Sequence, residues 1–470
     1  MIPRIVIAGT SSGAGKTTVA CGLIGALRAR GLRVQGFKVG PDYIDPSYHA
    51  LASRRPGRNL DAFLSGPDLI APLVRHGAAG AEIAVIEGVM GLFDGASGRG
   101  ELASTAHVAK LLRAPVLLVL DAASMARSAA AIVHGYRAFD PDVEIAGVVF
   151  NKVGSDHHEQ LLRDAVADLG VPVLGALRRD ERILTPERHL GLVPAGEHEH
   201  RALSALDALA GVVARYADLA EIERVARAAP DLRGVAWSPA PGGDGVEGVR
   251  IAIARGPAFS FHYEENLELL AATGAELAPF DPTVDEALPA EAGALVLAGG
   301  FPEIFGAELE ANAALRAAVG AFAGTGRPIL AECGGLLYLC DELDGQAMCG
   351  VLPARGRMTG RLTLGYREAV AATGAPWIDA GAQIRGHEFH YSAIEPIRPG
   401  APPAWTLSAR GAQRTEGMVV GSVQASYLHV HWAAHPQLAL GLARAAASHP
   451  SRMTHAACTL TSPDGERRPA

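Results

Sequence analysis

The stretch IVIAGTSSGAGKTT, residues 5–18, joins an apolar run to a glycine-rich loop and then to a helical segment. Gly13, Gly15, Lys16 and Thr17 stand in the order of a phosphate-binding loop. In such a loop, backbone N–H groups at a helix N-terminus hold phosphate oxygens, the lysine neutralises phosphate charge and the hydroxyl binds Mg²⁺. The stretch therefore predicts a strand, loop and helix that bind ATP with Mg²⁺.

The loop departs from the usual spacing at its first glycine. The pattern G-x-x-x-x-G-K-T would place glycine at position 10, where this chain has Thr10, and Gly9 precedes it. Because the strand, the later glycines, Lys16 and the helix follow in order, we interpret the stretch as a variant phosphate-binding loop, with Thr18 as a further nucleotide contact.

Outward from this loop, short apolar runs alternate with helical segments. Strands buried on both faces are continuous apolar runs, so the alternation indicates an α/β fold with a doubly wound, mostly parallel sheet. The Gly- and Pro-rich residues 237–249 indicate a linker, and a second α/β series follows them. Beyond about residue 350 the pattern favours short strands with many turns. The predicted divisions are a first domain over 1–231, a linker over 232–248, a second domain over 249–448 and a polar tail over 449–470.

Length and composition exclude several classes of protein. The 470 residues, 49% hydrophobic and 20% charged, are typical of a folded protein with two or three domains. The net charge of −8 gives no reason to expect a nucleic-acid partner. No segment has the length of a membrane span or signal sequence, so we expect no membrane partner and a cytoplasmic location. The five cysteines include no CxxC pair, which argues against a disulfide framework or zinc site.

Polar residues gather where further strands of the first domain are expected to end. Ligands of open α/β sheets bind outside the carboxyl ends of the strands, so these side chains are expected around the phosphate-binding loop. Glu87 directly follows an apolar run and is the candidate for holding Mg²⁺ or its water. The residues are Lys38, Asp42 and Asp45 in KVGPDYIDP, Glu87 and Asp94 in VIEGVMGLFDG, and Asn151 and Lys152 in VFNKV.

A second chemical feature is ILAECGGLLYLC, residues 329–340, where a strand-like run turns into a helix-like run at Cys333. A tight turn of this kind exposes the side chain, and small neighbours let a substrate carbonyl approach closely. The N–H of Gly334 is a candidate oxyanion donor, with a second donor from Gly299 or Gly300. The pattern predicts a nucleophilic thiol.

Such a thiol needs a base, because at a pKa of about 8.5 only a few per cent is thiolate at neutral pH. SYLHVHW, residues 426–432, supplies His429 and His431 on an expected strand end. Side chains two apart on a strand share a face, so both histidines could face Cys333.

Together these stretches resemble the cobyrinic acid a,c-diamide synthase family, also called hydrogenobyrinic acid a,c-diamide synthases. The likeness covers most of the chain and omits the linker and the final residues. GKT alone is common, whereas GPDYIDP and GHEFHYS are specific. In family order the motifs are GTSSGAGKTT, FKVGPDYIDPSYH, NLDAFL, VIEGVMGLFDG, NKVGS, FHYEENLELL, GGFPE, AECGGLLYL, RGHEFHYS and SYLHVHW.

The resemblance implies an ATP-dependent amidoligase domain similar to dethiobiotin synthetase, followed by an α/β glutamine amidotransferase domain with a cysteine nucleophile. The family amidates the a and c acetate side chains of a corrin macrocycle in the cobalamin pathway, using glutamine and ATP. A homodimer is compatible with it. By motif, Lys16 and Thr17 serve ATP and Mg²⁺, Cys333 is the nucleophile, Asp42, Asp45, Glu87 and Asp94 line the amidoligase site, and Tyr43 and Ile44 touch the macrocycle.

One position departs from related glutaminases, which carry glutamate two residues after the catalytic histidine. Here that position is His431, so the usual carboxylate that orients the base is missing from the motif. We favour His429 as the base because it follows Tyr-Leu, as the single histidine of related amidotransferases does, and His431 stays the alternative.

Three other readings of the whole chain stay open. A cobyric acid synthase would amidate other carboxylates, although GPDYIDP and GHEFHYS favour the a,c enzyme. A nickel-containing tetrapyrrole is a third possible acceptor, and the sequence does not separate cobalt-bearing from metal-free corrinoids. A partitioning-type switch ATPase would carry a lysine five residues before Lys16, where this chain has Ser11.

Overall fold

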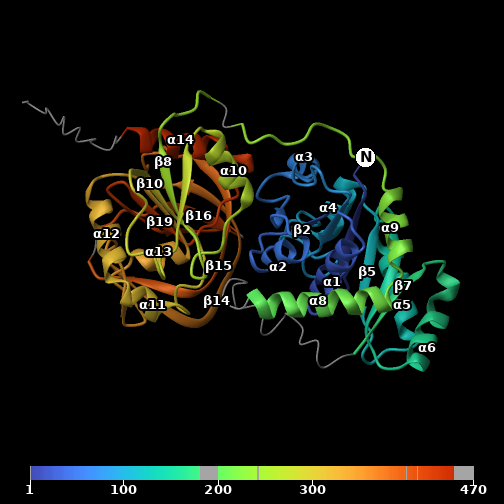
Figure 1. Cartoon of the computed structure of the whole chain (residues 1–470). Coiled ribbons are helices and arrows are strands. Elements are labelled where there is room, and N and C mark those ends of the chain that lie inside the picture. Colours follow the sequence, from blue (N-terminus) through green and yellow to red (C-terminus); the bar gives the residue numbers. More distant parts are fainter. Residues whose placement is uncertain (1, 180–198, 241–242, 399, 410, 449–470) are drawn as a thin grey trace, which may run out of the picture.

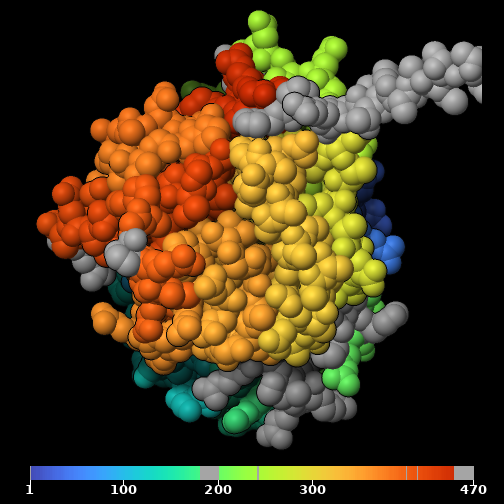
Figure 2. Space-filling model, turned by 90° about the vertical axis from the view of Figure 1, so that its left-hand side faces the viewer, coloured from blue at the N-terminus to red at the C-terminus, as the bar shows by residue number. Residues whose placement is uncertain are grey.

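Two α/β halves joined by one connecting segment make up the computed structural model (Figure 1). It describes residues 2–179, 199–240, 243–398, 400–409 and 411–448. The predicted tail over 449–470 lies outside the described residues. Seen from the side of the second half, that half covers most of the first (Figure 2).

The first half holds a seven-stranded sheet that is parallel throughout, in the order β3-β2-β4-β1-β5-β6-β7. Its strands are β1 (Arg4–Gly9), β2 (Val34–Val39), β3 (Arg58–Leu60), β4 (Ile83–Glu87), β5 (Val116–Asp121), β6 (Ile145–Val153) and β7 (Val173–Arg178). The apolar runs are buried because separate hydrophobic clusters pack on each face, as a doubly wound sheet requires.

Helices on both faces supply those clusters. One face carries α1 (Lys16–Ala29), α2 (Ile44–Ser53), α8 (Glu199–Tyr216) and α9 (Leu219–Ala228). The other carries α3 (Pro67–Gly77), α4 (Thr105–Leu112), α5 (Ser128–Phe139) and α6 (Asp156–Val166), which the short helix η1 (Ala167–Leu169) extends. The predicted parallel α/β architecture of this half is confirmed.

The second half is built on a six-stranded sheet in the order β18-β19-β11-β10-β8-β9, parallel except for its edge strand β18. The strands are β8 (Arg250–Ala254), β9 (Glu276–Phe280), β10 (Ala292–Leu297), β11 (Ile329–Glu332), β18 (Met418–Val420) and β19 (Val423–Ser426). The helices are α10 (Glu264–Ala272), α11 (Gly306–Ala311), α12 (Ala313–Gly324), α13 (Gly334–Leu339), η2 (Trp432–Ala434) and α14 (Gln437–Ala447).

A third, mostly antiparallel sheet follows β11 in sequence, and here the predicted short strands are partly wrong. Two of its strands are long and form one hairpin with a register shift between Met358 and Thr363. Most of the longest strand is exposed or half-buried, so no apolar run marks its length. The strands are β12 (Glu342–Leu343), β13 (Gln346–Ala347), β14 (Ala354–Ala371), β15 (Gln383–Pro396), β16 (Trp405–Ala409) and β17 (Ala412–Glu416).

Charged and aromatic contacts between the halves form what we call the interface. Arg58 at β3 donates to Glu265 at 2.7 Å and to Glu268 at 2.5 Å, both on α10. The Tyr366 hydroxyl of β14 donates to Asp61 at 2.8 Å, and its ring stacks on Phe63, two residues after Asp61. Buried ion pairs and ring stacking therefore fix the two halves against each other.

Across the described residues, no helix is long and apolar enough to cross a lipid bilayer. The predicted linker over 232–248 falls between α9 and β8, and its Trp237 packs against α3.

Candidate active sites

The glycine-rich loop between β1 and α1 has the conformation that its sequence requires. Gly13 and Gly15 adopt φ angles of 78° and 98°, which favour glycine. A Cβ on Gly15 would lie 2.0 Å from Nδ2 of Asn151, which also donates to the Ala14 carbonyl at 3.1 Å. Backbone conformation and packing against Asn151 thus both demand glycine at position 15.

The side chain of Lys16 lies across this loop. Its Nζ donates to the carbonyl oxygens of Ser11 at 2.9 Å and Met90 at 2.6 Å. A Cβ on Gly9 would lie 2.9 Å from the lysine side chain, so a larger residue there would push the lysine aside. This contact gives a physical reason for glycine at position 9, one residue before the usual place.

Glu87, at the end of β4, is the centre of a buried polar network. One carboxylate oxygen accepts from the Thr17 hydroxyl at 2.6 Å and from Lys38 at 2.8 Å, and the other lies 2.7 Å from Nε2 of His49. Burial alone would raise the pKa of Glu87, but Lys38 and His49 hold that pKa well below its usual value. A charged carboxylate therefore lies beside the first turn of α1.

Asp45 belongs to the same network through Lys38, which donates to it at 2.5 Å. Burial and the nearby carboxylates of Asp42 and Glu87 raise the pKa of Asp45 well above its usual value, against the pull of Lys38. His49 is not among the predicted site residues. Since Asp45 and His49 stand four residues apart on α2 and share a helix face, that spacing could have identified it.

The other predicted residues of this site have local contacts. Asp42 accepts from the backbone N–H groups of Ile44 and Asp45 and so caps α2, whereas Asp94 accepts from the N–H of Gly91 at 2.9 Å. Ile44 packs against the core of the first half. Thr18 is buried in the first turn of α1.

The donors beside α1 fit Mg²⁺. The Thr17 hydroxyl and Glu87 carboxylate are oxygen ligands within hydrogen-bond distance of each other. The described residues contain no ready cluster of three His, Cys, Asp or Glu ligands. Mg²⁺ commonly uses one or two protein ligands together with substrate phosphates and water, so these two residues suffice beside a nucleotide.

Cys333 forms the turn between β11 and α13. Its φ of 49° and ψ of −96° are strained for a residue other than glycine. The Cys333 N–H donates to the Ser426 carbonyl at 2.7 Å. The residue is 5% exposed, so the expectation that the turn exposes the thiol is wrong, because the turn packs against the loop after β10. Burial, followed by the carboxylates of Glu303 and Glu332, raises the pKa of this thiol well above its usual value. The thiol is held in place but is not a thiolate on its own.

Backbone amides surround this thiol. The N–H of Gly334 is close enough to the Cys333 sulfur to lower the thiol pKa, partly offsetting burial. A Cβ on Gly334 would lie 2.9 Å from the Gly300 nitrogen, and one on Gly299 would lie 2.5 Å from Cε1 of His429. The turn, the loop after β10 and the His429 ring therefore meet at one place.

The two candidate histidines face different groups. Nδ1 of His429 lies 3.7 Å from a carboxylate oxygen of Glu332. Nε2 of His431 lies 3.4 Å from Glu265, which itself pairs with Arg58 at the interface. The expected strand ends earlier, because β19 stops at Ser426 and His429 forms only an isolated bridge with His387.

Tyr43 reaches from the first site to the second. Its ring stacks on Phe261 at a centroid distance of 4.9 Å and lies 5.2 Å from the ring of His429. Tyr263 and His387 complete this buried group, with 2.9 Å between the Tyr263 hydroxyl and Nε2 of His387. We call these five side chains the aromatic cluster. Of these five, only Tyr43 and His429 are among the predicted site residues.

Family models match both halves of the chain. Residues 5–193 match the CobQ/CobB/MinD/ParA nucleotide binding domain, and residues 250–437 match the CobB/CobQ-like glutamine amidotransferase domain. The chain thus combines a nucleotide-binding domain with a glutamine amidotransferase domain, and its substrates include small molecules.

Relatives resemble the chain over nearly its whole length. A protein of Streptomyces coelicolor named hydrogenobyrinate a,c-diamide synthase is 54% identical over 93% of this chain and 96% of its own. One of the same name from Thermobifida fusca is 48% identical over 95% and 97%, respectively. A cobyrinate a,c-diamide synthase of Syntrophotalea carbinolica is 47% identical over 94% and 97%. Because these relatives are 47–54% identical over more than nine-tenths of each chain, the chain belongs to the cobyrinate and hydrogenobyrinate a,c-diamide synthase family.

Proposed function

We propose that this chain amidates the a and c acetate carboxylates of cobyrinic or hydrogenobyrinic acid, using ATP for activation and glutamine as the nitrogen source. The observation that carries the proposal is the position of Tyr43. Tyr43 follows Asp42, which belongs to the predicted nucleotide site, and its ring packs against His429 near Cys333. A single segment thus contacts both sites, as an enzyme requires that makes ammonia at one and uses it at the other.

Ammonia is released at Cys333. His429 takes the thiol proton, and the sulfur attacks the side-chain amide carbon of glutamine. The N–H groups of Gly334 and Gly300 hold the resulting oxyanion. His429 then gives the proton to the departing nitrogen, and water hydrolyses the thioester to glutamate.

The acceptor carboxylate is activated at the first site. A carboxylate has no leaving group, so its oxygen attacks the γ-phosphorus of ATP, ADP departs and an acyl phosphate forms. The loop over Gly13, Gly15 and Thr18 positions the phosphates, and Lys16 neutralises their charge. Ammonia then displaces phosphate and leaves the amide, and the same sequence serves the second carboxylate.

Thr17 and Glu87 would hold Mg²⁺, which supplies further neutralisation of phosphate charge. Lys38 fixes Glu87 and Asp45, and Asp42 and Asp94 shape the loops on either side. In this proposal Asp45 and Asp94, as carboxylates, accept the proton that the attacking ammonia loses. Tyr43 and Ile44 contact the corrin macrocycle from the same loop.

The remaining parts of the proposal concern partners, location and boundaries. In the proposal the macrocycle is the acceptor, a homodimer is compatible with the chemistry, and the location is cytoplasmic. We propose the domain boundaries predicted from the sequence: an amidoligase domain over 1–231, a linker over 232–248 and a glutamine amidotransferase domain over 249–448.

The test supplies ATP, glutamine and either cobyrinic or hydrogenobyrinic acid, and follows products by mass spectrometry. We expect two exchanges of OH for NH₂ on at least one macrocycle, and none without ATP. The isolated a,c-diamide is the matched control and should gain no further amide. Amidation of the a,c-diamide instead of the diacid would favour a cobyric acid synthase and overturn the proposal.

A further inference from the structure

The His429 ring is almost fully buried, and one of its nitrogens faces a carboxylate. Nδ1 lies 3.7 Å from Oε2 of Glu332, and no hydrogen-bond partner of Nδ1 occurs among the described residues. The ring carbon next to Nδ1, Cε1, approaches the loop after β10, where a Cβ on Gly299 would lie 2.5 Å from it. The same loop meets the Cys333 turn at Gly334, so the His429 ring lies between Glu332 and the loop that borders the thiol.

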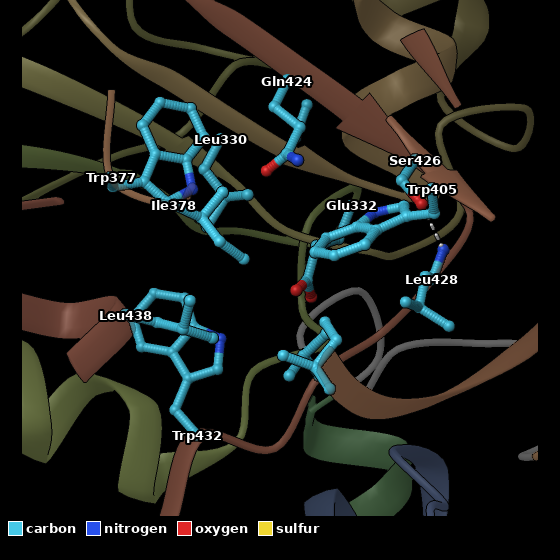
Figure 3. Close-up of a pocket in the computed structure, with 13 residues that line it drawn as sticks. Leu330, Glu332, Trp377, Ile378, Trp405, Gln424, Ser426, Leu428, Trp432 and Leu438 are labelled. Carbon is cyan, nitrogen blue, oxygen red and sulfur yellow. Dashed lines mark hydrogen bonds between the residues drawn. The ribbon is translucent and has the colours of Figure 1, made fainter. Parts of the chain in front are cut away.

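Among the described residues, His429 has the only basic side chain within 4 Å of the Glu332 carboxylate. The Glu332 side chain is 13% exposed and points into a cavity walled by Trp405 and Trp432 (Figure 3). In the part of the chain that the structure describes, no group donates a hydrogen bond to this carboxylate. A charge in an apolar site is costly unless it is paired, so the imidazole is the partner that this carboxylate requires.

We propose that Glu332 is the positioning residue of His429, taking the place of the glutamate that related glutaminases carry two residues after the histidine. Two unpartnered groups face each other, and a small side-chain rotation brings 3.7 Å to hydrogen-bond length. The contact would fix the proton on Nδ1 and leave Nε2 free to accept the thiol proton. That proton moves from sulfur to Nε2 and later to ammonia, while Glu332 stays charged throughout.

His431 is unsuited to this role although it occupies the position of the missing glutamate. Its Nε2 lies 3.4 Å from Glu265, and Glu265 is held by Arg58 of the first domain. His431 therefore belongs to the interface, and the nucleophile's own neighbour in sequence carries the carboxylate.

The inference rests on the proposed glutaminase role of Cys333 and His429, and several other charged or titratable groups act on this pair. Around His429 they are Glu332, His387 and Tyr43. Around the thiol they are Glu303, Glu332, Glu416, Tyr43 and Tyr427.

The sign of a pH shift separates a positioning role from a simple charge effect. Acting on the thiol alone, the Glu332 charge opposes thiolate formation, and Glu332→Gln would move thiol reactivity to lower pH. Acting through His429, the charge stabilises the imidazolium that pairs with the thiolate. Its removal would then move thiol reactivity to higher pH.

The experiment measures alkylation of Cys333 by iodoacetamide against pH in the full-length protein, together with glutamine hydrolysis. Cys333→Ala identifies the signal from this thiol. For Glu332→Gln we expect the alkylation curve to move to higher pH, and kcat for glutamine hydrolysis to fall on the order of 10²-fold with little change in KM. Glu332→Asp, which keeps the charge, should recover part of kcat. Thermal unfolding shows that each variant is folded.

Glu303→Gln is the matched control, since it removes another carboxylate that raises the thiol pKa. Its alkylation curve should move to lower pH. A shift of Glu332→Gln to lower pH, or an unchanged kcat, would overturn the inference while leaving the glutaminase proposal intact. If His429→Ala itself hydrolyses glutamine at the rate of the unmodified protein, the proposed role of His429 fails instead.

Discussion

His429 and His431 stand two residues apart, yet their rings serve different parts of the molecule. His429 lies against Gly299 and Glu332 near the thiol, whereas His431 faces Glu265 and packs on Tyr263 at a ring-centroid distance of 4.6 Å. At the scale of single residues, proximity in sequence therefore says little about shared chemistry.

This difference predicts unequal effects of substitution. His429→Ala should lower the rate of glutamine hydrolysis on the order of 10²-fold or more, because no other base would take the thiol proton. His431→Ala should cost clearly less, and both variants should still amidate the macrocycle with free ammonia. Rates of glutamate release and of ammonia-dependent amidation check this. A larger loss for His431→Ala would exchange the two assignments.

At the scale of elements, the loop from β2 to α2 has two duties. It carries Asp42, which holds the first turn of α2 with Asp45 beside the Glu87 network, and it projects Tyr43 onto Phe261 and His429. A change in this loop on nucleotide or macrocycle binding would therefore be transmitted to the thiol site.

Tyr43→Ala should loosen the link between the two reactions. Without the ring, we expect more glutamine to be hydrolysed per amide formed, because His429 loses a packing partner that depends on the loop. Tyr43→Phe is the control, since it keeps the ring that makes these contacts. The ratio of glutamate to amide product is measured for both, and equal ratios in Tyr43→Ala and the unmodified protein would contradict the coupling.

The loop between β1 and α1 predicts a separation of the two activities. Lys16→Ala should reduce amidation about 10²- to 10³-fold with either glutamine or ammonia, because a donor aimed at developing phosphate charge is lost. Glutamine hydrolysis at Cys333 should persist. The control is Lys110→Ala. It removes a lysine of α4 that pairs with Glu101 and Asp140. Undiminished ammonia-dependent amidation in Lys16→Ala would rule out the role of this loop.

Features that depend on neighbouring residues could be predicted from the sequence, whereas contacts between residues far apart in the chain could not. The loop around Lys16 and the turn at Cys333 are short, local patterns, and both have the predicted backbone form. The contact of Glu332 with His429 joins residues almost a hundred positions apart, and that of Tyr43 with Phe261 crosses both domains. No periodicity or spacing reports such contacts, because tertiary packing alone creates them.

The long β14–β15 hairpin was missed for a related reason. An apolar run or a strict alternation marks a strand that is buried on one or both faces. Much of β14 is exposed, and its length is set by pairing with β15 instead. Arg361 and Gly365, within β14, carry no local signal for an extended strand.

At the scale of the whole molecule, the interface supplies stability as well as communication. Arg58 lies almost buried between Glu265 and Glu268. Burial alone would raise the pKa of Glu265, but His431 and Arg58 lower it to about 2. A carboxyl whose pKa falls on folding contributes stability above its unfolded pKa of about 4.3, and that contribution is lost as pH falls toward the folded value.

Arg58→Met should therefore lower the free energy of unfolding by about 3–5 kcal/mol, since the buried Glu265 carboxylate loses its guanidinium partner and keeps only the His431 ring beside it. Its stability should also vary less with pH between about 4.3 and 2 than that of the unmodified protein. Arg357→Met, which breaks an exposed pair with Glu395, should cost no more than about 1 kcal/mol. Chemical denaturation at several pH values tests both, and equal losses in the two variants would show that the interface pair adds no special stability.

The packing of Trp237 has a consequence for how such an enzyme is encoded. This residue of the connecting segment lies on α3, whereas Val246, later in the segment, donates its N–H to the Thr273 carbonyl at 2.7 Å, so the segment is anchored to each domain separately. The ion pairs of Arg58 and the aromatic cluster join the two domains directly. A gene divided within the connecting segment would thus still specify two products with matching surfaces. Each product made alone would expose tyrosine and phenylalanine rings to water, so the two reading frames would need to be expressed together.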